Sequence, residues 1–306
     1  MASVADERSP VDRAYLPAVP ESIRRDFVLP DRFLDEDVRP WRDEMRRRFG
    51  PLAGDCKTRK EAILRIATDA AKICGVDYST GRRAANQGVM ESLGSRRASC
   101  TGLSILLAAA YRSVGIPARL AGVGEWGDRP GNHTWVEVWD GDWHAIEYYP
   151  DPKGWDHGWF YEPVVNDDPA NPRSRVRAAV PGGPEIFFLP WAPANTSVRG
   201  VDRMADYRRV AASLGVRRTK ARPGMMLVPV VAEAGGARVA VAFRISDGDK
   251  VLFDARTPGP LDDLNNAPRA ELAPGKTYVF EYTDNTGTKR TRSLTIKTGE
   301  PAVLPL

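Results

Sequence analysis

The chain has 306 residues, of which 42% are hydrophobic and 27% are charged, and its formal net charge is +4. This balance is typical of a folded globular protein and argues against a disordered or collagen-like chain. The positive charge is mild for this length, and the arginine-rich segments, such as RRTKAR at residues 217–222, are short and lie beside no nucleic-acid-binding motif. We therefore expect no nucleic-acid partner.

The sequence contains no membrane-spanning or secretory signal. No window of 18 apolar residues exists, so we expect no transmembrane helix. The first residues, MASVADERSP, lack the apolar stretch of a secretory signal. These features predict a cytoplasmic protein, or a secreted or periplasmic one if a signal was removed. They give no indication of the oligomeric state.

The three cysteines, Cys56, Cys74 and Cys100, have no CxxC spacing, so we expect neither a metal site nor another cofactor. Cys56 and Cys74 fit a disulfide as well as two buried free thiols, and the sequence leaves both readings open.

The first half of the chain predicts helices. Residues 1–58 form an N-terminal segment with a surface helix in DEDVRPWRDEMRRRF. KEAILRIATDAAKICG has one apolar stripe along a helix that Gly75 ends. Residues 81–97 read as a loop with a short helix. In SCTGLSILLAAAYRSVGIPARLAGV, Ser99 or Thr101 caps a helix that is apolar nearly all round and stops near Gly115 and Pro117. This pattern predicts a buried central helix.

The rest of the chain predicts mainly strands. ARLAGV reads as a strand, and HTWVEVWDGDWHAIEYY reads as a hairpin that turns at Asp140 and Gly141. Residues 160–196 predict an extended wrap, and DRMADYRRVAASLG predicts a helix. From Met225 onward, short β runs alternate with turns, which is typical of an antiparallel sandwich. The predicted fold is α+β, with domains at residues 1–58, 59–196, 197–222 (a helical linker) and 223–306.

Cys100 is the candidate nucleophile. A free cysteine is usually a small buried hydrophobe. Here the thiol lies at the predicted start of a helix, where backbone N–H groups and the helix dipole favour a thiolate. Its neighbours are small, and Arg96 and Arg97 add positive potential.

A thiolate needs a base, and the chain has only His133, His144 and His157. His133 opens a strand of the hairpin, whereas the other two lie in a Trp-rich region where packing accounts for them. Strand register decides whether Glu147 reaches His133. A two-residue loop turns Glu147 to the other face of the sheet. A three-residue loop, Trp139 to Gly141, places it opposite His133 at about 5 Å, and we favour this register because Gly141 suits the last loop position.

The order of SCTGLSILLAAAYRSVGIPARLAG and GNHTWVEVWDGDWHAIE resembles the transglutaminase-like superfamily, relatives of papain-like cysteine proteases, over roughly residues 60–160. The resemblance implies a papain-like core with a buried helix on an antiparallel sheet, Cys100 as nucleophile and His133 as base. The family's third residue is usually aspartate. Glu147 stands four residues beyond Trp143 at that position, and Asp151 is an alternative.

Three further residues complete the predicted site. The backbone N–H of Cys100 is the expected oxyanion donor, and Gln87 is the candidate side-chain donor, although a surface glutamine explains it equally well. We expect Trp135 to shield the imidazole and Glu137 to be structural.

These residues predict an enzyme that attacks an amide or peptide carbonyl and forms a thioester, which water or an amine resolves, and the resemblance implies a bacterial-type member of the superfamily. The expected partner is a protein or peptide substrate, such as a cell-wall peptide. The alternative is a non-catalytic protein that binds peptides or glycans through its dense aromatic residues. Zinc binding by Cys100, His133 and Glu147 is the weakest reading. The C-terminal sandwich resembles Ig-like and carboxypeptidase-regulatory-like modules, and its fold alone assigns it no ligand.

Overall fold

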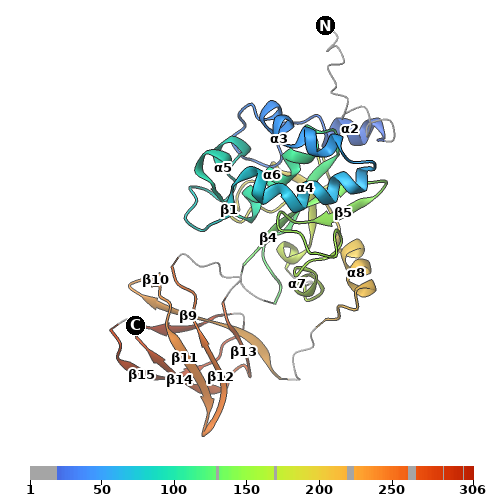
Figure 1. Cartoon of the computed structure of the whole chain (residues 1–306). Coiled ribbons are helices and arrows are strands. Elements are labelled where there is room, and N and C mark those ends of the chain that lie inside the picture. Colours follow the sequence, from blue (N-terminus) through green and yellow to red (C-terminus); the bar gives the residue numbers. More distant parts are fainter. Residues whose placement is uncertain are drawn as a thin grey trace.

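The computed structural model describes residues 19–128, 131–168, 171–218, 224–260, 267–284, 286–298 and 300–306. An α/β body is followed by a second body made of strands (Figure 1). The predicted α+β class is therefore confirmed. The four domain boundaries stay predictions, and the first 18 residues and the boundary at residues 222 and 223 lie outside the described residues.

Most helices of the α/β body precede its sheet in the chain. Their bounds are α2 Glu21–Phe27, α3 Arg42–Gly54, α4 Arg59–Cys74, α5 Val89–Ser95, α6 Cys100–Ser113, α7 Tyr161–Val165 and α8 Met204–Ser213, and a 3-10 turn lies at Pro172–Ser174. The predicted helix at residues 60–75 is α4, whose C-cap Gly75 has a φ of 62°. The helix α3 is less exposed than predicted, because Met45, Phe49 and Ala53 are fully buried.

The helix α6 is the buried central helix that the sequence predicts. Ser99 caps it by accepting a hydrogen bond from the Gly102 N–H at 3.0 Å. Every residue of α6 after Cys100 is buried. The chain then reverses through Gly115, whose φ of 84° suits a residue without a Cβ.

A six-stranded antiparallel sheet lies at the centre of this body, in the order β5-β4-β3-β6-β8-β7. Its strands are β3 Ala118–Val123, β4 His133–Trp139, β5 Trp143–Ile146, β6 Arg177–Ala179, β7 Glu185–Ile186 and β8 Arg199–Asp202. The predicted extended wrap at residues 160–196 is therefore partly wrong, because it contributes α7, the inner strand β6 and the edge strand β7. A separate short pair joins β1 Asp77–Tyr78 to β2 Arg97–Ala98 in parallel.

Helices cover both faces of the six-stranded sheet. Val136 and Val138 of β4 belong to the core shared with α3, α4 and α6. Trp135 of the same strand belongs to a second core, which includes residues of α7 and α8. Because side chains alternate along a strand, β4 contributes to both cores. The first of these cores packs α6 against β4, and the second packs α7 and α8 against the other face of β4.

The second body is a pair of sheets around one apolar core. Its strands are β9 Met226–Ala234, β10 Ala237–Arg238, β11 Ala242–Asp247, β12 Lys250–Arg256, β13 Arg269–Leu272, β14 Thr277–Thr283, β15 Lys289–Thr295 and β16 Ala302–Pro305. One sheet has the order β12-β11-β14-β15, and the other joins β10, β9, β13 and β16. The predicted sandwich is observed, but not wholly antiparallel, since β16 pairs with β9 in parallel.

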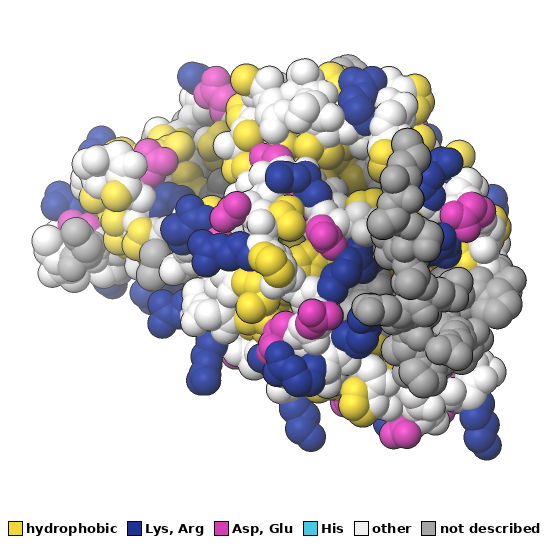
Figure 2. Space-filling model, turned by 90° about the horizontal axis from the view of Figure 1, so that it is seen from above, with side chains coloured by type: hydrophobic (Ala, Val, Ile, Leu, Met, Phe, Trp, Pro, Cys, Tyr) yellow, Lys and Arg dark blue, Asp and Glu magenta, His cyan; other side chains and the backbone are white. Residues whose placement is uncertain are grey.

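On the face shown in Figure 2, cationic and anionic side chains lie interspersed with apolar ones. Within the described residues, no helix has both the length and the apolar character needed to cross a bilayer.

Candidate active site

Cys100 is the first residue of α6 and is only partly buried, unlike the rest of that helix. Ser99 fixes the preceding turn, because its hydroxyl donates to the Ala85 carbonyl while it caps Gly102. A Cβ at Gly102 would lie 2.9 Å from the Ala98 Cβ, so the helix start packs too tightly for a larger residue. The thiol is therefore held at the N-terminal end of a buried helix, where negative charge is favoured.

Hydroxyl contacts join the start of α6 to β4. Thr101 Oγ1 and Thr134 Oγ1 are 3.0 Å apart and buried. Ser104 Oγ lies 2.8 Å from the Cys100 carbonyl oxygen and 2.9 Å from that of Thr134. These contacts set the position of the helix against the strand that carries His133.

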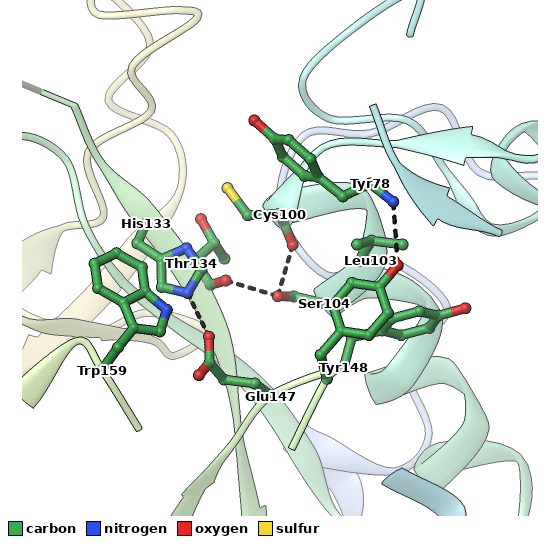
Figure 3. A pocket seen from close by; sticks show the side chains of 10 residues that line it. Tyr78, Cys100, Leu103, Ser104, His133, Thr134, Glu147, Tyr148 and Trp159 are labelled. Atoms are coloured by element: carbon green, nitrogen blue, oxygen red, sulfur yellow. Dashed lines mark hydrogen bonds and ion pairs between the residues drawn. The ribbon is translucent and has the colours of Figure 1, made fainter. Parts of the chain in front are cut away.

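His133 opens β4 and lies between Cys100 and Glu147 (Figure 3). Its Nε2 is 2.6 Å from Glu147 Oε1, and both side chains are nearly buried. This contact leaves Nδ1 to face the thiol. Burial lowers the pKa of His133, but hydrogen bonds and charge interactions with Cys100 and Glu147 outweigh it and raise the pKa to about 10. The imidazole is therefore protonated at neutral pH.

The hairpin register differs from the predicted one. Trp139 pairs with Trp143 and Val136 with Ile146, so the loop comprises residues 140–142, with Gly141 at its centre and a φ of 93°. The predicted pairings of Val138 with Asp142 and Glu137 with Trp143 are wrong. Continuing the observed register places Glu147 opposite Trp135, one diagonal step from His133 and on the same face. The predicted and observed registers differ by an even step, which keeps the two side chains on one face.

The other predicted site partners lie elsewhere. Asp151 accepts a hydrogen bond from the Lys153 N–H within a turn. His144 Nδ1 is 2.6 Å from Asp156 Oδ2, and its ring stacks on Trp155. His157 Nδ1 is 2.9 Å from the Trp155 carbonyl oxygen.

Gln87 is fully buried in the loop before α5 and does not face the thiol. Its Nε2 donates to Ser95 Oγ at 3.2 Å and to the Arg97 carbonyl at 3.0 Å. Its Oε1 accepts from the Arg83 N–H at 2.9 Å. An oxyanion donor needs a hydrogen that points toward the reacting carbonyl. This geometry contradicts the predicted oxyanion role. The hydrogen bonds of Gln87 instead stabilise the loop that carries it.

Glu137 and Trp135 lie behind the imidazole on β4. Glu137 is 1% exposed and accepts from Arg119 Nε at 2.7 Å and from Arg203 Nε at 3.0 Å, which joins β4 to β3 and to the residue before α8. The Trp135 ring centroid is 5.7 Å from that of His133, and its Nε1 donates to Tyr207. Both residues occupy the structural positions that the sequence suggests.

The remaining cysteines differ from Cys100 in their surroundings. None of the three cysteines, all of which lie in the described part of the chain, forms a disulfide, so the disulfide alternative for Cys56 and Cys74 is not observed. Burial raises the pKa of the Cys74 thiol to about 11 and also raises that of Cys56. Among the described residues, no group of three or more His, Cys, Asp or Glu side chains has a metal-binding arrangement.

The thiol lies between two adjoining hollows of about 420 Å³ each, and both are lined by Tyr78 and Cys100. The first, which we call the aromatic half, also contains Tyr149 and Trp159 together with His133 and Glu147. The second, which we call the arginine half, also contains Arg82 and, from the strand body, Arg238. An elongated substrate can therefore extend on both sides of the sulfur.

The sequence model of the transglutaminase-like superfamily matches residues 48–157, which include Cys100, His133 and Glu147. Residues 48–157 form a transglutaminase-like domain. At the level of the superfamily, this domain supports a cysteine-dependent enzyme.

Solved structures resemble parts of the chain around the transglutaminase-like domain. A Cytophaga hutchinsonii protein provisionally assigned as a cysteine protease is 20% identical over 49% of this chain and 48% of its own, with a TM-score of 0.35. Red sea bream transglutaminase is 11% identical over 94% of this chain and 65% of its own, with a TM-score of 0.40. A third structure, described as a transglutaminase, is 15% identical over 40% of this chain and 35% of its own, with a TM-score of 0.30. A search of curated proteins returned no match.

The sequence pointed to only some of the residues that line this cleft. Tyr149 and Trp159 are each 49% exposed, and both come from the aromatic stretch that follows the hairpin. Their density in sequence was a usable signal. Tyr78 and Arg82 gave none, because they come from a loop without periodicity and reach the thiol only through the tertiary fold.

Gly158 directly follows the matched part of the transglutaminase-like domain and leaves no room for a side chain. A Cβ there would lie 2.5 Å from Phe160 Cε1 and 3.2 Å from Glu147 Oε2. We expect Gly158→Ala to displace Glu147 and to slow alkylation of Cys100 severalfold, measured with iodoacetamide at pH 7. Gly94→Ala, in α5, where nothing lies within 4 Å of the added Cβ and φ is not positive, controls for the added methyl group. An unchanged alkylation rate in Gly158→Ala would show that Glu147 does not depend on this contact.

Proposed function

We propose that this protein is a cysteine-dependent enzyme that acts on amide or peptide C–N bonds, with Cys100 as nucleophile, His133 as proton carrier and Glu147 as the residue that orients it. One observation carries the proposal. The imidazole of His133 contacts the thiol at the start of α6 on one side and the Glu147 carboxylate, at 2.6 Å, on the other. A nucleophile, a base and an orienting group in this order define a triad.

The chemistry follows from the charges. Cys100 Sγ, as a thiolate, adds to the carbonyl carbon, and the oxyanion is stabilised by the backbone N–H of Cys100 at the helix start. Protonated His133 donates its proton to the amide nitrogen, the C–N bond breaks, and the amine leaves a thioester on Cys100. Neutral His133 then removes a proton from water or from a second amine, which attacks the thioester. An acid or a new amide leaves, and the thiolate–imidazolium pair is restored.

Glu147 stands where the family usually has an aspartate, and its carboxylate contacts the imidazole of His133. Its carboxylate stabilises the imidazolium and fixes Nε2, so that Nδ1 faces the sulfur. The longer side chain is matched by the diagonal offset between residues 133 and 147 in the observed register. Protein and peptide substrates belong to this proposal, cell-wall peptides among them, and hydrolysis and acyl transfer use the same residues.

Selective labelling tests the proposal. At pH 7 we expect iodoacetamide to modify Cys100 about 100-fold faster than Cys56 or Cys74, because the thiols of the latter two have raised pKa values. Peptide mass mapping would locate the label. Incubation with peptides or cell-wall extracts should then give an acyl adduct on Cys100 that hydroxylamine removes and that Cys100→Ala lacks. Slow, equal labelling of all three cysteines would contradict the proposal that the protein is a cysteine-dependent enzyme.

The second candidate is a non-catalytic protein that binds peptides or glycans on the same scaffold. The exposed side chains of Tyr78, Tyr149 and Trp159 beside the cleft favour it, because aromatic surfaces suit such ligands. Binding without an adduct on Cys100 would support this alternative.

A further inference from the structure

The cleft has two chemically different sides, and the position of His133 decides which part of a substrate each side receives. Tyr78 and Cys100 line both halves, whereas His133 lines only the aromatic half. The leaving nitrogen must lie within hydrogen-bond reach of the imidazole that protonates it. The amine part of the substrate therefore occupies the aromatic half, and the acyl part extends across Cys100 into the arginine half.

The arginine half has the composition of an anion site. Arg82 Nη1 donates to the Ser79 carbonyl at 3.3 Å, and Arg82 Nε is buried without a hydrogen-bond partner among the described residues. A buried donor of this kind is costly unless a ligand satisfies it. No described residue that lines this half is an aspartate or a glutamate.

The strand body brings a second guanidinium to the same hollow. Arg238 of β10 lines the arginine half together with Pro260, and its Nη2 lies 3.4 Å from the Pro260 carbonyl oxygen. Guanidinium groups bind carboxylates through paired, charge-assisted hydrogen bonds. The C-terminal body thus contributes directly to the acyl side of the cleft.

We infer that the substrate carries a carboxylate on the acyl side of the scissile amide, where Arg82 and Arg238 bind it, and an apolar or aromatic group on the amine side. This inference rests on the proposed function and names its substrate class. The carboxylate belongs either to the side chain of an α-linked acidic residue or to the free α-carboxylate of a γ-linked glutamyl group.

The first test measures the thiol and needs no substrate. In the full-length protein, alkylation of Cys100 by anionic iodoacetate is compared with alkylation by neutral iodoacetamide. Arg82→Gln should lower the iodoacetate-to-iodoacetamide rate ratio about fivefold, because it removes one positive charge close to the sulfur. The charge-matched control is Arg83→Gln, since Arg83 is exposed, pairs with Glu91 and does not line the cleft. Equal ratios in the two variants would overturn the role of Arg82.

The second test measures turnover of peptides that differ at the residue on the acyl side. Wild type should cleave an α-linked Glu peptide or a γ-linked glutamyl peptide with a kcat/KM about tenfold above that of its neutral amide counterpart. The better of the two acidic peptides identifies the source of the carboxylate. Arg82→Gln should lower the ratio of kcat/KM for the acidic peptide to that for the neutral peptide to about one.

Different results would contradict the substrate class and the enzyme activity. Equal cleavage of acidic and neutral peptides, with Cys100 still hyper-reactive, would overturn the substrate class and leave the enzyme intact. Cleavage that persists in Cys100→Ala would overturn the proposed function itself.

Discussion

Replacing Glu147 by Gln should lower kcat/KM about 100-fold and slow iodoacetamide labelling of Cys100 at pH 7, because the imidazolium loses its counter-charge. Without the carboxylate, the proton of the thiolate–imidazolium pair returns to the sulfur. Glutamine keeps the size of the side chain, so the effect isolates the charge at 2.6 Å from Nε2. Turnover of a peptide and the alkylation rate measure the two consequences separately.

The pH dependence of turnover shows in which direction Glu147 shifts the pKa of His133. Turnover needs protonated His133, whose pKa is raised from 6.5 to about 10. Wild-type activity should therefore persist through neutral pH and fall as the pH rises past about 10. Since Glu147 is one of the groups that raise this pKa, Glu147→Gln should move the alkaline limb to lower pH. The profile of kcat/KM for the free enzyme reports this limb.

Two variants control this experiment. Glu147→Asp restores the charge on a shorter side chain and should recover part of the activity. Asp156→Asn alters the pair formed by His144 and Asp156, which also has a 2.6 Å contact but does not line the cleft, and it should leave the profile unchanged. An alkaline limb that stays in place in Glu147→Gln would show that Glu147 does not orient the imidazole.

Replacing Glu137 by Gln should lower the free energy of unfolding by about 3 kcal/mol, since it leaves two arginines without their shared partner. Glu137 is 1% exposed and bonds Arg119 and Arg203, and Arg119 is also nearly buried. An uncompensated charge in such a place costs more than the loss of an exposed ion pair. Chemical denaturation followed by tryptophan fluorescence measures the difference.

The matched control is Glu21→Gln, which makes the same substitution in an exposed pair with Arg24. It should change the unfolding free energy by less than about 1 kcal/mol. If the two variants lose equal stability, the buried cluster does not stabilise the α/β body in the way described.

Local patterns predicted the elements whose periodicity and stop signals agree. The helix α4 was predicted to within one residue, because its apolar stripe runs up to Gly75, which ends the helix. The helix α6 and the strand β3 followed from mainly apolar runs bounded by Ser99 and Pro117. The placement of Cys100 at a helix start is thus encoded locally.

Elements that depend on distant partners were not predictable in this way. The strands β6 and β7 are two or three residues long, too short to show an alternation of apolar and polar residues. They form because their backbones pair with those of β3 and β8. The hairpin loop was placed one residue too early, because Asp140, Gly141 and Asp142 all suit a turn. Gln87 was misassigned because nothing local shows that Ser95 and Arg97 fold back onto its amide.

The contact between Thr101 and Thr134 links the packing of α6 against β4 to the reactivity of the Cys100 thiol. Each threonine directly follows a proposed reacting residue, and their hydroxyls meet across the boundary between helix and sheet. A fluctuation that separates α6 from β4 breaks this contact. The same movement separates the sulfur of Cys100 from the imidazole of His133. The sulfur then becomes an ordinary thiol while most of the secondary structure is still present. The nucleophilicity of the sulfur therefore depends on the packing of α6 against β4.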